Sequence, residues 1–105
     1  MTELDLAVER LVRRVSHWTP PRWAASSASG AGSRADVMHA LVQQVADLAA
    51  TAEGQPRRRV PRLANDLALP DQLRVVARDL SATGDEAAMA AAVALLSDLD
   101  RLPSL

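Results

Sequence analysis

Apolar residues recur at alternating spacings of three and four along most of the chain, a pattern typical of amphipathic α-helices. The clearest example opens the sequence, where Thr2 and Asp5 have the spacing of a helix capping box. We predict a first helix over residues 2–18, which the helix-breaking pair Pro20 and Pro21 ends. Its apolar stripe consists of Leu4, Val8, Leu11, Val15 and Trp18.

The same pattern predicts three further long helices and a short one. Ser33 and Asp36 repeat the capping spacing at the start of the second helix, and Gly54 ends it. No alternating apolar run is long enough to predict a strand. The predicted fold is therefore an all-α helical bundle with a helical content of about 65 to 75%. Its main helices span about residues 2–18, 34–53, 71–82 and 85–102, with a short helix near 62–69.

Two segments interrupt the helical pattern within what we predict to be a single helical domain, residues 1–105. Residues 24–33 contain only small or uncharged side chains without periodicity, which indicates a flexible loop. Residues 55–62 form a connector that combines two prolines with four arginines. We expect this basic connector to be extended.

The apolar content of 49% overstates the core that the chain can build. Alanine accounts for 21 residues, against 15 leucines and 10 valines, and an alanine side chain removes little area from water. Self-association is a common remedy for a small core of this kind.

The last predicted helix has an unusual surface on the side opposite its apolar stripe. A solvent-facing helix surface normally bears charges, whereas this one bears small uncharged residues. Either the helix is covered on two sides within its own chain or it pairs with a second copy, and we favour pairing. The predicted homodimer interface consists of Ala87, Ala90, Ala91 and Ala94.

Both tryptophans, the only aromatic residues of the Phe, Tyr and Trp class, lie in the heptapeptide from His17 to Trp23. Trp18 continues the stripe of the first helix, so we expect it in the core. Trp23 follows two prolines and is expected to be the more accessible ring, although it could fold back over the end of the bundle. With His17 and Arg22 it forms a candidate binding site for a protein or an apolar ligand.

Four arginines of the connector are the best candidate for an anion contact: Arg57, Arg58, Arg59 and Arg62. Charge is uneven along the chain, with a net charge of +3 over residues 1–62 and −4 over residues 63–105. All twelve cations are arginine and lysine is absent, a bias that a GC-rich coding sequence also produces. A solvated loop that complements the acidic half is therefore the preferred interpretation, and nucleic-acid binding is possible but disfavoured.

The segment of residues 69–80 begins with Leu69-Pro70 and continues through Arg74 and Val76. It resembles the opening of region 4 of sigma factors and similar helix-turn-helix regulators. The resemblance covers about twenty residues, with Glu86-Ala87-Ala88 following, and implies that the next helix would read DNA. In this chain the next helix is alanine-rich and acidic, with Arg101 as its single cation.

The sequence lacks the residues and motifs that several kinds of chemistry require. The absence of cysteine excludes disulfides, thiolate catalysis and cysteine-based metal sites. His17 and His39 have no partner at metal-ligand spacing, and no nucleotide-binding or nucleophile-elbow motif occurs. We therefore expect no metal, no cofactor and no enzymatic activity.

The longest uncharged helical run, residues 87–97, is too short for a bilayer, which needs about 20 apolar residues. The acidic first residues do not form a secretion signal, so we expect a cytoplasmic protein without membrane contact. The sequence predicts a non-catalytic helical interaction or assembly module that self-associates, without specifying a protein partner. The alternatives are a small nucleic-acid-binding transcriptional regulator that uses the Arg57–Arg62 loop, or a carrier of an apolar ligand near Trp18 and Trp23.

Overall fold

Five α-helices and one 3-10 turn account for 67% of the chain in a computed structural model that describes residues 1–105. No strand is present. The prediction of an all-α bundle with four long helices is therefore confirmed. The elements are α1 (Glu3–Val15), α2 (Pro20–Ala24), α3 (Arg34–Ala52), η1 (Asp66–Ala68), α4 (Leu69–Thr83) and α5 (Glu86–Asp100).

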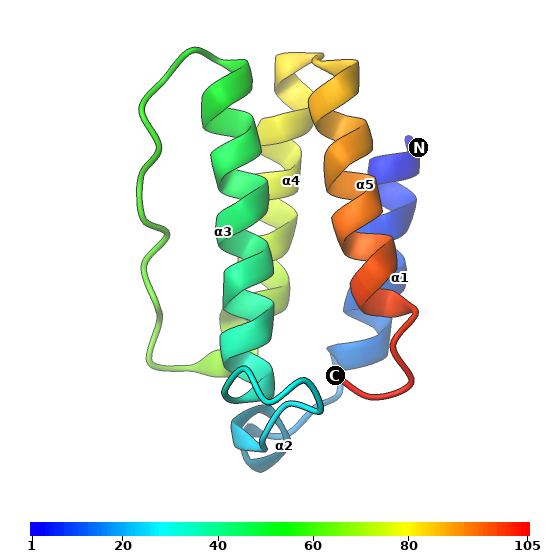
Figure 1. The fold of residues 1–105 in the computed structure, drawn as a ribbon, viewed down its shortest axis with the longest axis vertical. Coiled ribbons are helices and arrows are strands. Elements are labelled where there is room, and N and C mark those ends of the chain that lie inside the picture. Colours follow the sequence, from blue (N-terminus) through cyan, green and yellow to red (C-terminus); the bar gives the residue numbers. More distant parts are fainter.

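The four long helices lie side by side, with α1 and α5 running in one direction and α3 and α4 in the other (Figure 1). The most extensive packing joins α3 to α4, and α5 packs mainly against α1. Residues 53–65 return along the outer side of α3 to the base of the bundle, which is why α3 and α4 are parallel (Figure 1). As a result, α5 meets α3 only along a seam.

Local signals fix most helix ends. The Thr2 hydroxyl accepts a hydrogen bond from the Asp5 amide, and the Asp5 carboxylate accepts one from the Thr2 amide, each at 3.1 Å. Ser33 and Asp36 form the same reciprocal box at the start of α3. Gly84 ends α4 in the left-handed conformation, with φ of 68°, which glycine adopts without strain. Both predicted capping boxes are confirmed.

The first helix is shorter than predicted, because it ends at Val15 rather than at residue 18. Thr19 precedes Pro20, and the residue before a proline avoids the helical conformation, so the chain leaves the helix and turns here. Pro20 and Pro21 then occupy the first turn of α2, where a missing amide hydrogen does no harm. The helix α2 was not predicted. In the predicted short helix near 62–69, only η1 is helical before α4 begins.

Both tryptophan rings are buried at the base of the bundle. Their ring centroids lie 4.8 Å apart with an interplanar angle of 64°, an edge-to-face pair. Trp23 is 1% exposed and Trp18 is 6% exposed, so the prediction that Trp23 is the more accessible ring was wrong. The physical reason is α2, which turns Trp23 back beneath the core. The rings therefore offer no open groove for a ligand.

The segments around this base are tied to one another. The amide of Ser27 donates to the carbonyl of Gly32 at 2.8 Å, so the predicted loop closes on itself as a tight turn. The amide of Ala28 donates to the carbonyl of Leu105, whose side chain is buried. The Arg14 guanidinium donates to the carbonyl oxygens of Asp100 and Leu102 just beyond α5. These bonds hold the end of α5 against α1.

The basic connector is held along one polar face of α3. The side-chain amide of Gln43 donates to the carbonyl of Arg58 at 2.9 Å and accepts from the amide of Val60 at 2.8 Å. The His39 ring nitrogen Nε2 lies 3.0 Å from the carbonyl of Val60. The Gln43 amide thus pairs with extended backbone as a neighbouring strand would, which confirms the expected extended conformation.

We predict that Trp18→Ala and Trp23→Ala each lower the free energy of unfolding by about 3–5 kcal/mol, because each removes a large ring from a packed core. Denaturant melts measure this loss. Leu6→Ala is the matched control, since it removes an exposed apolar side chain of α1. A Trp23→Ala variant within about 1 kcal/mol of the unmodified chain would contradict the core role of that ring.

Candidate functional site

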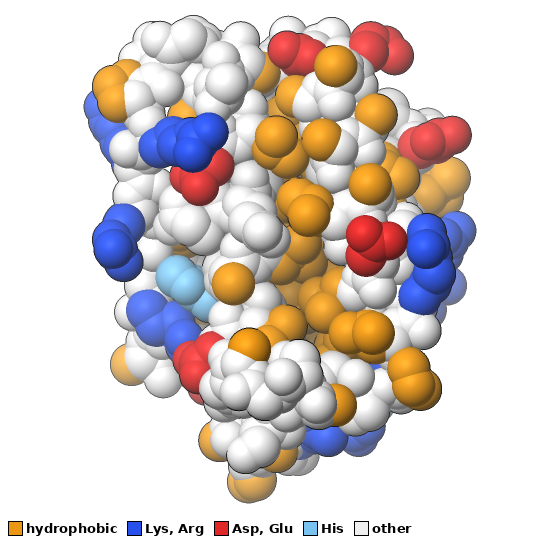
Figure 2. All heavy atoms as spheres, in the orientation of Figure 1, with side chains coloured by type: hydrophobic (Ala, Val, Ile, Leu, Met, Phe, Trp, Pro, Cys, Tyr) orange, Lys and Arg blue, Asp and Glu red, His pale blue; other side chains and the backbone are white.

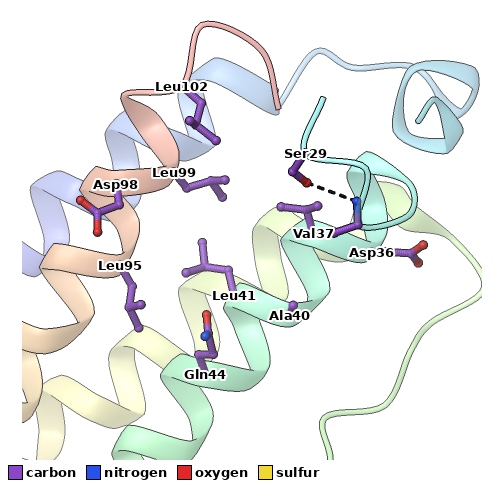
Figure 3. A pocket seen from close by; sticks show the side chains of 11 residues that line it. Ser29, Asp36, Val37, Ala40, Leu41, Gln44, Leu95, Asp98, Leu99 and Leu102 are labelled. Atoms are coloured by element: carbon purple, nitrogen blue, oxygen red, sulfur yellow. Dashed lines mark hydrogen bonds between the residues drawn. The ribbon is translucent and has the colours of Figure 1, made fainter. Parts of the chain in front are cut away.

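The seam between α3 and α5 opens into an apolar groove of about 480 Å³. Figure 3 shows side chains from both helices pointing toward one another across it. Leu41 of α3 is buried at its floor, whereas Leu95 and Leu99 of α5 are half-buried. Leu102, just beyond α5, is 42% exposed at the end of the groove that is nearest the base of the bundle. The remaining lining residues are Ser29, Ala31, Asp36, Val37, Ala40, Gln44 and Asp98.

The outer side of α5 extends this apolar surface. All four alanines of the predicted interface are exposed, so no segment of the chain covers them: Ala87, Ala90, Ala91 and Ala94. Figure 2 shows hydrophobic side chains gathered along α5 and down the furrow beside α3, with charged groups mostly at the margins. We call the groove together with these alanines the α3/α5 face. It is the most continuous apolar surface in this view.

The alanines were predicted from the sequence, whereas the groove was not. Leu95, Leu99 and Leu102 follow one another at the spacing of a core stripe, whereas the buried positions of α5 are Ala92 and Leu96. The difference arises because α5 packs mainly against α1 and turns its leucines toward a seam that α3 does not close. Helical periodicity reports which side chains share a side, and only the tertiary arrangement shows which side is covered.

The four connector arginines separate into two groups. Arg62 is part of the fold, because its guanidinium donates to Asp36 at 2.8 Å and to Asp66 at 3.3 Å. The other three, Arg57, Arg58 and Arg59, are exposed and form no ion pair. The candidate anion site therefore contains three arginines rather than four.

The Arg62 hydrogen bond lowers the pKa of Asp36 from 3.8 to about 2, with a further contribution from the capping bonds of Ser33. A hydrogen bond from Arg74 likewise lowers the pKa of Glu9 and joins α4 to α1. The backbone and hydroxyl of Thr2 lower the pKa of Asp5. All three shifts favour the charged carboxylate in the folded chain, as structural hydrogen bonds do.

The polar members of the heptapeptide do not form a pocket with its rings. His17 is exposed in the turn after α1. The guanidinium of Arg22 lies 5.1 Å from the centroid of the Trp18 ring, and that of Arg34 lies 5.4 Å from it. Both are cation–π contacts that shield the ring from water. The alternative of an apolar-ligand carrier at the tryptophans therefore lacks an accessible cavity.

The structure does not support the helix-turn-helix resemblance. α4 and α5 run antiparallel within one bundle (Figure 1), whereas the helices of that motif cross at a steep angle. The outer side of α5, where a recognition helix would contact DNA, presents the alanines instead.

No group of three or more histidine, aspartate or glutamate side chains is placed to hold a metal ion. No helix combines the length and apolar character needed to cross a lipid bilayer. No protein-family model, curated protein or solved structure matches the chain. The α3/α5 face, as an exposed apolar surface, is therefore the candidate site.

We predict that acid destabilises the fold as Asp36 becomes protonated. The pKa of this carboxylate is lower in the folded chain, about 2, than in an unfolded chain, about 3.9. Its stabilising contribution is therefore complete above about pH 4 and is lost as the pH falls toward 2. In urea melts across this range, Asp36→Asn should flatten the decline in the free energy of unfolding.

The matched control is Asp79→Asn, because the Asp79 carboxylate forms no ion pair and should leave the decline unchanged. If Asp36→Asn and the unmodified chain lose stability in parallel from pH 4 to pH 2, the Arg62 hydrogen bond does not govern this acid response.

Proposed function

We propose that the chain is a non-catalytic helical interaction module that self-associates through the α3/α5 face. The observation that carries this proposal is the exposure of four alanines and of Leu102 on a surface that the chain itself leaves uncovered. Contiguous exposed apolar patches on small soluble domains commonly mark sites of protein contact. Small side chains also allow a partner helix to approach closely.

The dimensions support the use of the whole face. A helix of 15 residues is about 22 Å long. The area of its outer side alone is smaller than the area that each partner buries in a standard interface, which is about 800 Å². The adjoining groove supplies additional apolar area. We therefore assign both parts of the α3/α5 face to one interface.

The proposal assigns no catalytic group, because neither histidine lies in this face. His17 is exposed at the base, and His39 is engaged with the connector. The charged residues that line the groove, Asp36 and Asp98, are each within ion-pair distance of an arginine. They suit the polar rim of an interface better than a reaction centre.

Nucleic-acid binding is the second candidate function. It is favoured by the three unpaired arginines of the connector, which lie away from the α3/α5 face on an extended backbone held by Gln43. Phosphate contacts of this kind weaken steeply as salt rises. Salt-sensitive retention of the chain on DNA would support this candidate.

We predict that Ala91→Glu raises the dissociation constant of the dimer by about a hundredfold, because the dimer would then bury two unpaired carboxylates in an apolar contact. Sedimentation velocity over a concentration series measures the effect. Ala82→Glu is the matched control, since it places the same charge on an exposed alanine of α4. A monomeric unmodified chain at tens of micromolar, or an Ala91→Glu variant that dimerises normally, would contradict the proposal.

A further inference from the structure

The charges at the ends of the α3/α5 face limit how a second copy can lie on it. Between Glu86 and Asp98, α5 carries no charged residue at all. Glu86 is exposed at the first turn of the helix, and Arg101 is exposed just after its last turn. The uncharged surface therefore has an acid at one end and a base at the other, about 22 Å apart.

We propose that the second copy lies antiparallel, with its α5 against α5 and across the groove, so that Arg101 of each copy meets Glu86 of the other. This inference rests on the proposed function, and it specifies the occupant of the face and its direction. In a parallel pair, Glu86 would face Glu86 and Arg101 would face Arg101. Like charges so placed oppose association, whereas the antiparallel pair joins opposite charges at both ends.

The remaining charge of the outer face agrees with this direction. Asp98 lies 3.4 Å from Arg101 of its own chain and is 70% exposed. In an antiparallel pair it lies level with Met89 of the other copy, one helical turn from Glu86 of that copy, whereas in a parallel pair it would lie directly opposite a second Asp98. The dipoles of the two α5 helices also oppose one another in the antiparallel pair, a favourable arrangement at both ends.

The small side chains are placed where the two helices would cross. The midpoint between Glu86 and Arg101 falls next to Ala94, so the two-fold axis lies within the run of exposed alanines. The exposed residues nearest this level, Ala90, Ala91 and Ala94, have small side chains that allow the two helix axes to approach closely. Toward the first turn of each helix, Ala87 of one copy comes level with the stretch between Leu99 and Leu102 of the other, where the groove opens.

Charge exchange tests the direction. Glu86→Arg and Arg101→Glu should each weaken the dimer about tenfold in sedimentation equilibrium, because each places like charges together at both ends. The double variant restores opposite charges and should return the dissociation constant to within about threefold of the original. Circular dichroism confirms that each variant folds.

This design separates pairing from an effect on the helix itself. Each reversal opposes the helix dipole, so a purely intrachain effect would make the double variant the weakest dimer of all. That result, or dimerisation that ignores all three changes, would overturn the antiparallel arrangement while the proposed function stands. A monomeric unmodified chain would overturn both.

Two cysteine variants give a second test that does not depend on stability. The chain has no cysteine, so any disulfide must join the introduced residues. Ala94→Cys lies beside the proposed two-fold axis and should cross-link on oxidation, whereas Ala87→Cys should not, because its two copies lie about 20 Å apart along the helix axis. Cross-linking at both positions would indicate a parallel pair, and cross-linking at neither would overturn the arrangement.

Discussion

The attachment of the connector to α3 is the constraint on which the arrangement of the helices depends. A short loop after α3 would place the next helix antiparallel to it, as in most bundles. Here the Gln43 side chain binds the backbone on both sides of Arg59, and Arg62 binds Asp36, so residues 53–65 run the length of α3 before α4 begins. α3 and α4 therefore lie parallel and form the largest contact of the bundle.

This contact determines what is left uncovered. α3 packs mainly against α4, and α5 packs mainly against α1, which leaves an apolar groove along the seam between α3 and α5. A chain richer in large apolar residues could fill such a seam from within. In this chain the two largest side chains, Trp18 and Trp23, are buried at the base of the bundle, and α5 consists mainly of alanine. The face that remains apolar is consequently one that a second chain can cover.

Local signals in the sequence predicted most of the fold. The capping boxes at Thr2 and Ser33 and the glycine at position 84 mark helix ends through bonds to adjacent backbone, so they can be read without tertiary information. The tandem prolines were read as the end of one helix, whereas they also begin another. Their position relative to Trp23 reversed the expected exposure of that ring.

The candidate site was predictable only in part. The missing charges of α5 pointed to Ala87, Ala90, Ala91 and Ala94, and the structure shows that the chain leaves these residues exposed. The groove could not be foreseen, since its walls come from helices distant in sequence and its leucines obey the same periodicity as core leucines. The pairing of Arg62 with Asp36 also depends on the tertiary path of the connector, and no local pattern distinguishes Arg62 from its three neighbours.

The most direct test of this account uses the unmodified chain. In an isotope-filtered NMR experiment, a mixture of labelled and unlabelled chains shows only the contacts between copies. The account predicts contacts from the methyl groups of Ala90, Ala91 and Ala94 to the second copy. Contacts that arise instead from other exposed apolar residues, such as Leu6 of α1 or Val75 of α4, would contradict it, and so would a spectrum without contacts at several hundred micromolar.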